Sequence, residues 1–289
     1  MIKAIIKTMR PRQWTKNVFV LAPLVFDRQL TNPTALARSL AGMLLFCLIS
    51  SCVYVLNDIM DVNSDRMHPV KKNRPIASGA LPIKGAYFLV AILLLISVPL
   101  SFWLSPAYGI IALIYFGINL AYSIWLKHIP LIDVLIIAAC YVLRVAAGVV
   151  LITVERFSPW LYIVTTLFAL FIGFGKRRAE LTLLEGEAKS HRRVLDGYNI
   201  PLLDQLITIV SGTTVVAYSL YTFTAPNIPA NHAMMLTIPF ILYGIFRYLW
   251  LINVKHAGGA PEELVFTDRP LQVTILLWGL SVLLIFYTS

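Results

Sequence analysis

The chain has 289 residues, of which 58% are hydrophobic and only 13% charged, and its formal net charge is +10. A soluble domain carries roughly 25% charged residues, so this composition, with a mean hydropathy of +0.78, excludes an ordinary soluble protein. The apolar segments leave no length for a soluble nucleic-acid-binding domain, and we interpret the positive charge as facing a membrane.

Helices are the default way to cross a bilayer, and a spanning helix needs about 20 mainly apolar residues. Nine segments qualify, although the first and sixth are weak. They run over Thr15–Phe26, Ala35–Ile59, Leu81–Leu104, Ala107–Leu126, Leu131–Thr153, Pro159–Phe174, Leu202–Phe223, Met234–Asn253 and Leu271–Tyr287. We therefore predict an all-α integral membrane protein with nine transmembrane helices and a single polytopic domain over residues 1–289.

The N-terminal residues do not resemble a signal peptide, because lysines and arginines interrupt them and no small-residue cleavage site follows. Cys47, Cys52 and Cys140 lie inside predicted spans and have no metal-like spacing, so we expect structural thiols.

Lysine and arginine are distributed unevenly between the two ends of the predicted spans. Most of the 24 lie before the first span or in every second connection after it. The opposite connections hold only Arg28, Arg38 and Arg156. The positive-inside rule then predicts a multi-pass plasma (inner) membrane protein with a cytoplasmic N-terminus and an external C-terminus.

Four oxygen-bearing side chains gather where the second span ends. Asn57, Asp61 and Asp65 are spaced by four residues, and Asp58 precedes Asp61 by three. At this spacing all four project from one helix face, where like charges repel unless a cation relieves them. Hard oxygen ligands suit Mg²⁺ or Ca²⁺ rather than zinc. The alternative is a solvated helix end whose acids are incidental.

A basic loop follows directly. His68-Pro69 is expected to end the helix, because proline cannot continue it. Lys71, Lys72 and Arg74 then place cations beside the acids. An acid–metal site next to basic side chains is suited to a phosphorylated ligand, whereas His68 alone is more typical of a structural residue.

Arg144 lies near the middle of the fifth predicted span. A charge at that depth costs roughly 2.5–3.5 kcal/mol on insertion scales and usually faces a cavity or a partner. Arg144 could bind a substrate phosphate or form a structural ion pair. Asp133 lies on nearly the same face, but three turns earlier, which is too far for direct pairing.

The stretch "NDIMDVNSD", followed by "RPIASG", resembles the first aspartate motif of the UbiA superfamily of intramembrane prenyltransferases. "YSIWLK" supplies the tyrosine and lysine of that family's next cytoplasmic loop, as Tyr122 and Lys127. The resemblance covers essentially the whole chain. It implies a helical bundle around a central cavity open to the cytoplasm, with Mg²⁺ held by the aspartates against a substrate diphosphate.

One expected motif of that family is missing. Most members carry a second aspartate-rich motif after the sixth span, where this chain reads "GFGKRRAELTLLEGE". Lys176, Arg177 and Arg178 replace the acids, and Glu180 is the nearest carboxylate. These cations could anchor the helix end, or they could bind phosphate directly in place of a second metal.

With "RPRQWTKN", "LRVAAG", "KRRAEL" and "GGAPEELVFTDRPLQ", the chain resembles the decaprenyl-phosphate phosphoribosyltransferase branch of the family. That branch joins a polyprenyl phosphate to phosphoribosyl diphosphate (PRPP), on a route to cell-wall arabinan. Three anionic groups must then be held, which explains cations where a second metal motif is usual.

The resemblance implies a set of roles. Asp58, Asp61 and Asp65, supported by Asn57, would hold Mg²⁺ and be the catalytic residues. The expected substrate-binding residues are Asn57, Lys71, Arg74, Lys127, Arg144, Lys176 and Arg177, with Tyr122 and Glu180 assigned to the ribose.

Two other functions stay open. A family member of the usual kind would move a prenyl group from a prenyl diphosphate to an aromatic or lipophilic acceptor, and "KRRAEL" counts against it. A transporter of anionic solutes would also use an intramembrane arginine, but it needs no aspartate face. The length of the polyprenyl tail and a homo-oligomeric state are not determined by the sequence.

Overall fold

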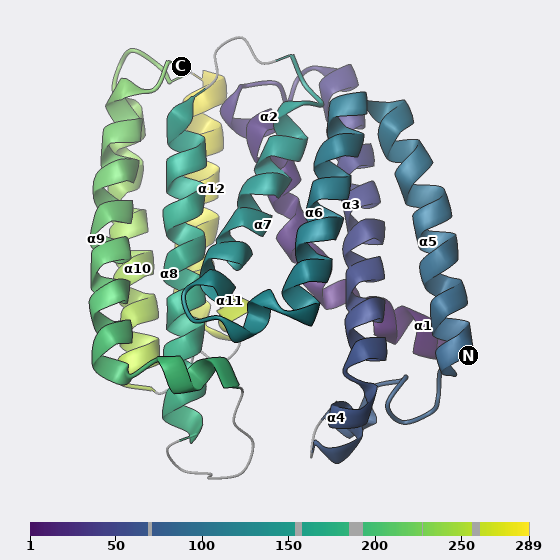
Figure 1. Cartoon of the computed structure of the whole chain (residues 1–289). Coiled ribbons are helices and arrows are strands. Elements are labelled where there is room, and N and C mark those ends of the chain that lie inside the picture. The colour runs from purple at the N-terminus through teal and green to yellow at the C-terminus, as the bar shows by residue number, and fades with distance from the viewer. Residues whose placement is uncertain (69–70, 154–157, 185–192, 227, 256–260, 289) are drawn as a thin grey trace. The chain divides into compact units, whose positions relative to one another are not determined.

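The computed structural model describes residues 1–68, 71–153, 158–184, 193–226, 228–255 and 261–288. Helices dominate this part of the chain, and no β-strand occurs in it (Figure 1). The chain divides into two compact units. The first comprises Met1–Leu126 and Leu143–Val154, and the second comprises Lys127–Val142 and Glu155–Ser289.

The first unit is built around α3, a long helix packed against α5 and flanked by α1, the 3₁₀ helix η1 and α6. Its elements are α1 (Ile2–Met9), η1 (Pro11–Leu21), α2 (Ala22–Phe26), α3 (Pro33–Met60), α4 (Val62–Met67), η2 (Lys71–Asn73), α5 (Ile83–Leu104), α6 (Pro106–Ile124) and the last part of α7 (Ile132–Val149). The short 3₁₀ helix η3 (Leu126–His128) begins in this unit, but its other two residues belong to the second unit.

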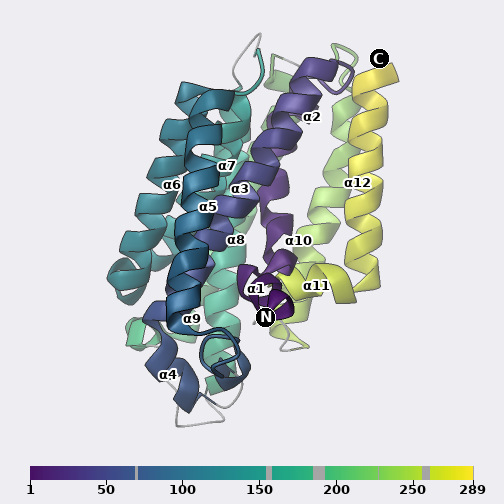
Figure 2. The same ribbon diagram turned by 90° about the vertical axis from the view of Figure 1, so that its right-hand side faces the viewer.

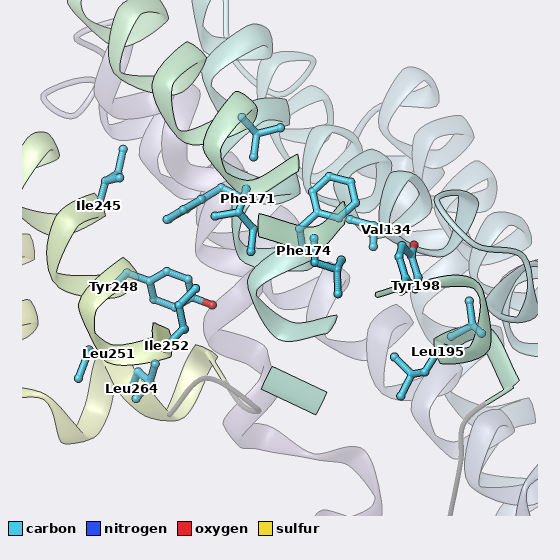
Figure 3. Packing of buried hydrophobic residues seen from close by; sticks show 14 residues of the cluster. Val134, Phe171, Phe174, Leu195, Tyr198, Ile245, Tyr248, Leu251, Ile252 and Leu264 are labelled. Carbon is cyan, nitrogen blue, oxygen red and sulfur yellow. The ribbon is translucent and has the colours of Figure 1, made fainter. Parts of the chain in front are cut away.

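In the second unit α8 packs against α9, and α10 packs against α12. Its elements are the start of α7, α8 (Pro159–Leu184), η4 (Arg193–Gly197), α9 (Ile200–Thr224), η5 (Ala233–Thr237), α10 (Ile238–Asn253), α11 (Pro261–Thr267) and α12 (Arg269–Thr288). Buried apolar side chains from α7, α8, η4, α9, α10 and α11 and from Tyr198 form one core, which includes Phe171, Tyr248 and Ile252 (Figure 3).

Eight helices of the described residues are long and apolar enough to cross a membrane. They correspond to the second to ninth predicted spans, so the prediction of a multi-pass, all-helical membrane protein is confirmed. Local signals explain several ends: Asn32 caps α3 before Pro33, and Asn199 caps α9 before Pro201. The sixth span was predicted to end at Phe174, but α8 continues to Leu184 because the residues after Phe174 are mostly good helix formers.

The first predicted span, Thr15–Phe26, has an unusual backbone. It lies in η1, which winds as a 3₁₀ helix over 11 residues before the short α2. Runs of 3₁₀ helix longer than 3–4 residues are uncommon. In Figures 1 and 2 the segment leaves α1 near the N-terminus and rises along α3. Asn17 at its centre is fully buried and donates hydrogen bonds to Cys47 and Ser50 of α3.

A close backbone contact holds η1 against α7. A Cβ placed on Gly148 would lie 2.1 Å from the carbonyl oxygen of Val20 and 3.0 Å from the ring of Pro23. Backbone cannot yield as a flexible side chain can, so α7 needs glycine here for η1 to pack.

We therefore expect Gly148→Ala to destabilise the protein by about 1–3 kcal/mol, the usual cost of overpacking. Gly117→Ala on α6 is the matched control, because nothing lies within 4 Å of its Cβ position. The melting temperature of each purified variant in detergent would show the difference. Equal melting temperatures for the two variants would contradict close packing of η1 on α7.

Candidate active site

Two buried carboxylates and two arginines meet where α3 ends and α4 follows. Asp58 and Asp65 are each 2% exposed. Nη1 of Arg74 lies 2.6 Å from Oδ2 of Asp65 and 3.1 Å from Oδ1 of Asp58, so one guanidinium bridges both acids. Arg10, which has a left-handed backbone between α1 and η1, forms a second ion pair with Asp58 and stacks over the ring of Tyr54. We call these four residues the aspartate–arginine cluster: Asp58, Asp65, Arg10 and Arg74.

The helix that carries the acids is interrupted at Asp61. Asp61 ends α3 and begins α4, which ends at Met67 as His68-Pro69 predicted. The predicted single helix face therefore becomes two short faces joined at a bend, which Figure 1 shows below α3. Hydrogen bonds from Asp61 N to Asn57 O and from Asp65 N to Asp61 O keep the helical spacing across the bend. Asp58 and Asp65 consequently meet at Arg74.

These carboxylates suit a divalent cation. Among the described residues, no three His, Cys, Asp or Glu side chains lie close enough to bind a metal by themselves. Magnesium sites, however, commonly use one or two carboxylates and complete their shell with water and substrate phosphates. Asp58 and Asp65 already share one positive group, the guanidinium of Arg74, so their oxygens fit such a cation. Asn57 and Asp61 are close to these acids in the sequence, and both are half-buried. Their role as metal ligands stays a prediction.

The other predicted residues around this end differ in exposure. Lys71 is exposed in η2, directly before the loop that carries Arg74. Tyr122 is half-buried in the last turn of α6. Their contribution to substrate binding also stays a prediction.

Arg144 is 3% exposed within the first unit. Its Nε donates to Oδ1 of Asn17 at 2.9 Å, its Nη2 donates to the hydroxyl of Tyr115 at 2.8 Å, and it lies 4.8 Å from the centre of the Tyr115 ring. It also lies 5.7 Å from the ring centre of Phe46. The guanidinium on α7 therefore connects this helix to η1 and α6. Its N–H groups donate hydrogen bonds, and its flat face packs against aromatic rings.

Arg177 is the centre of a buried network in the second unit. Its side chain is 1% exposed, and its Nε donates to Oδ2 of Asp133 at 2.6 Å. Its Nη1 donates to Oε2 of Glu180 at 2.5 Å, one turn further along α8. Arg177 thus meets two carboxylates of the protein, so the predicted role in phosphate binding would have to compete with these pairs.

Tyr198 extends the network to the loop before α7. Its hydroxyl donates to Oδ1 of Asp133 at 2.7 Å and accepts the backbone N–H of Leu131 at 2.6 Å. Burial and the hydrogen bond to the Asp133 carboxylate raise the pKa of this hydroxyl above its ordinary value. Tyr198 therefore stays protonated at neutral pH and serves as a permanent donor to Asp133.

The neighbouring cations have separate surroundings. Arg178 pairs with Asp204 of α9 at 2.5 Å and donates to the carbonyl oxygen of Ile252. Lys176 and Lys127 are both half-buried. Of the three cations in "KRR", two are therefore engaged by carboxylates of the second unit.

The sequence patterns did not predict several residues of these networks. Asp133 was noted only as a distant neighbour of Arg144, and nothing marked Tyr198 or Arg10 individually. The signal that could have indicated Asp133 is its charge in the first turn of an apolar span, where an acid needs a buried partner.

Removing Arg177 would leave Asp133 charged and buried, which typically costs 3–5 kcal/mol. We expect Arg177→Ala to lower the melting temperature strongly, whereas Lys176→Ala, a half-buried neighbour on the same helix, should lower it far less. Thermal unfolding of both purified variants measures this. If Arg177→Ala melts like the wild type, the ion pair contributes nothing to stability.

Comparisons with known proteins identify the family of the chain. The sequence model of the UbiA prenyltransferase family matches residues 18–267. A decaprenyl-phosphate phosphoribosyltransferase from Mycolicibacterium smegmatis is 35% identical over 96% of this chain and 91% of its own length. A protein of the same name from Corynebacterium glutamicum is 33% identical over 98% of this chain and 86% of its own.

A solved UbiA homolog from Archaeoglobus fulgidus, bound to GPP and Mg²⁺, has the same fold, with a TM-score of 0.73 at 17% identity over 98% of this chain and 99% of that one. The family match over most of the chain and the two relatives establish that this chain belongs to the UbiA prenyltransferase family.

Proposed function

We propose that the protein transfers the 5-phosphoribosyl group of PRPP to a polyprenyl phosphate and releases diphosphate. The observation that carries the proposal is the similarity, over nearly the whole chain, to two proteins named decaprenyl-phosphate phosphoribosyltransferase. The basic residues Lys176–Arg178 of α8, two of which pair with carboxylates of the protein, give it weaker support, because this chemistry places more anionic groups in the site than a prenyl transfer to a neutral acceptor does.

Asp58 and Asp65 would hold a divalent cation, with Asn57 and Asp61 contributing to its shell. Metal-bound structures of the same fold support Mg²⁺. When bound, the cation would stabilise negative charge on the diphosphate leaving group. Arg74 and Lys71 lie on the loop beside the acids and would bind the phosphate oxygens that face away from the metal.

The nucleophile would be an oxygen of the lipid phosphate, which forms a bond to carbon 1 of the ribose as the carbon–diphosphate bond breaks. A phosphate monoester has a second pKa of about 6 and is largely ionised at neutral pH, so no strong general base is required. The protein would work through positioning and charge stabilisation.

We assign the remaining anions to basic side chains outside the metal site. Lys127 and Lys176 are half-buried and would bind phosphate, and Arg144 would contribute its charge from within the first unit. Arg177 would act mainly by holding Glu180, and Glu180 and Tyr122 would bond the ribose hydroxyls.

We also propose nine membrane crossings, with η1 and α2 forming the first. A 3₁₀ helix rises about 2.0 Å per residue and an α-helix about 1.5 Å, so their 11 and 5 residues extend about 30 Å, the thickness of the hydrocarbon core. Nine crossings put the two termini on opposite sides of the membrane, and the charge distribution then predicts a cytoplasmic N-terminus and an external C-terminus.

The substrate pair can be tested directly, because the family also includes enzymes that move a prenyl group. We expect purified protein to make a labelled lipid from radiolabelled PRPP and polyprenyl phosphate, but not from a prenyl diphosphate and an aromatic acid. Lipid extraction and chromatography measure both. Product from the second pair alone would replace the proposal with prenyl transfer.

The metal site can be tested with one substitution and one chelator. Asp65→Asn keeps the shape of the side chain but removes a charged ligand, so turnover should fall about a hundredfold, the order expected for a lost charge-assisted contact. EDTA should stop the wild type and Mg²⁺ should restore it.

Asn63→Ala, on the exposed side of the same short helix, is the control and should keep normal turnover. Full turnover of the wild type in metal-free buffer would refute the metal's role.

A further inference from the structure

The turn before α7 is held in a backbone conformation that its residue type disfavours. Leu131 has φ of +67°, in the left-handed region, where a non-glycine residue is uncommon. Such a conformation persists only when the surroundings impose it. Leu131 is 44% exposed, so burial of its own side chain does not account for it.

Two consecutive residues at the end of η4, more distant in the sequence, hold this turn. The hydroxyl of Tyr198 accepts the N–H of Leu131. Gly197 packs so closely that a Cβ on it would lie 2.2 Å from Cγ of Pro130. We call Gly197 and Tyr198 the clamp, because one contacts the ring of Pro130 and the other the backbone of Leu131.

The clamp is itself anchored in the core. Tyr198 is 7% exposed and Leu195 is 2% exposed, and both belong to the apolar cluster that includes Val134 and Phe174 (Figure 3). The clamp therefore cannot move without opening packed apolar surface. Through Asp133 the hydroxyl of Tyr198 also connects to Arg177 and so to Glu180 on α8.

The clamped turn lies directly after a basic pair. Lys127 and His128 end η3, two residues before Pro130. With so short a connection, the position of the turn sets that of the Lys127 backbone. The same network holds Glu180, which shares α8 with Lys176.

We propose that Gly197 and Tyr198 are positioning residues: they hold the Pro130–Leu131 turn so that Lys127 is placed to bind an anionic group of the substrate. The inference rests on the proposed function, in which Lys127 binds phosphate. Neither clamp residue needs to touch substrate, and the effect should be on binding more than on the chemical step.

The test is Tyr198→Phe, which keeps the ring and removes the hydroxyl. The KM for PRPP or for polyprenyl phosphate should rise about tenfold, as expected for one lost hydrogen bond that involves a charged network, with kcat changed less than about twofold. Leu131→Asn in the same chain should recover much of the loss, because asparagine tolerates the left-handed region. An unchanged KM for both substrates would overturn the proposal.

Tyr218→Phe is the matched control. The Tyr218 hydroxyl is also buried in the second unit and also makes two hydrogen bonds, to Thr237 and Trp278. This variant should lose stability in a similar way but keep both KM values. If it raises KM as much as Tyr198→Phe does, the effect is general loosening and the clamp has no specific role.

A second variant changes the contact with Pro130 instead of the hydrogen bond to Leu131. It tests the proposal if Tyr198→Phe does not fold. Gly197→Ala should raise the same KM, because the new Cβ meets the ring of Pro130. Adding Pro130→Ala removes the Cγ atom that it meets and should bring the KM back toward the wild-type value. No rise in KM for Gly197→Ala would contradict the proposal.

A readout that needs no activity separates this inference from the proposed function. Trypsin should cleave after Lys127 about tenfold faster in Tyr198→Phe than in Tyr218→Phe, since the lost hydrogen bond frees the turn. If the wild type makes no lipid product from PRPP, the proposed function fails, and the cleavage rates still report on the clamp. Equal cleavage rates would refute the clamp itself.

Discussion

A charged side chain buried in an apolar helical protein is stable only when another group replaces the water it has lost. Arg177 and Asp133 show how strongly this constraint acts here, because both are almost completely buried and each bonds the other. Around this pair, Tyr198 donates a hydrogen bond to Asp133 and Glu180 accepts one from Arg177, so the start of α7, the later part of α8 and the segment before α9 are held together. The ion pairs and hydrogen bonds of these few side chains thus determine where the three segments meet.

The same constraint acts on the aspartate–arginine cluster, with a different outcome. Asp58 and Asp65 are buried, but Arg10 and Arg74 are more than a quarter exposed. The two arginines lie outside α-helices, one at the α1–η1 junction and the other in a loop, whereas the acids lie on helices. A cation that competes for the acids can therefore displace the arginines at less cost than it could break the Arg177–Asp133 pair. The difference in exposure between the two sets of arginines therefore favours the metal site that we propose at Asp58 and Asp65.

Much of the fold follows from apolar segments of about 20 residues, and proline and asparagine at positions 33 and 199 explain where helices begin. The 3₁₀ conformation of η1 could not be predicted in this way. It depends on contacts far away in the sequence, between Asn17 and α3 and between Val20 and Gly148. The bend at Asp61 was also missed, since hydrophobic periodicity carries no information about a single residue that leaves the helical conformation.

For the site, the spacing of the acids was informative because the i, i+4 backbone hydrogen bonds continue across Asp61 and keep residues one or two turns apart close in space. The roles of the basic residues were harder to predict, because sequence counts charges without showing their partners. "KRR" suggests three cations for an anionic ligand, yet Arg177 and Arg178 bond carboxylates of the second unit. The positive charge that α8 can offer a substrate is therefore smaller than its sequence indicates. If this part of α8 binds an anion as we propose, Arg177 and Arg178 would have to exchange their carboxylate partners for it.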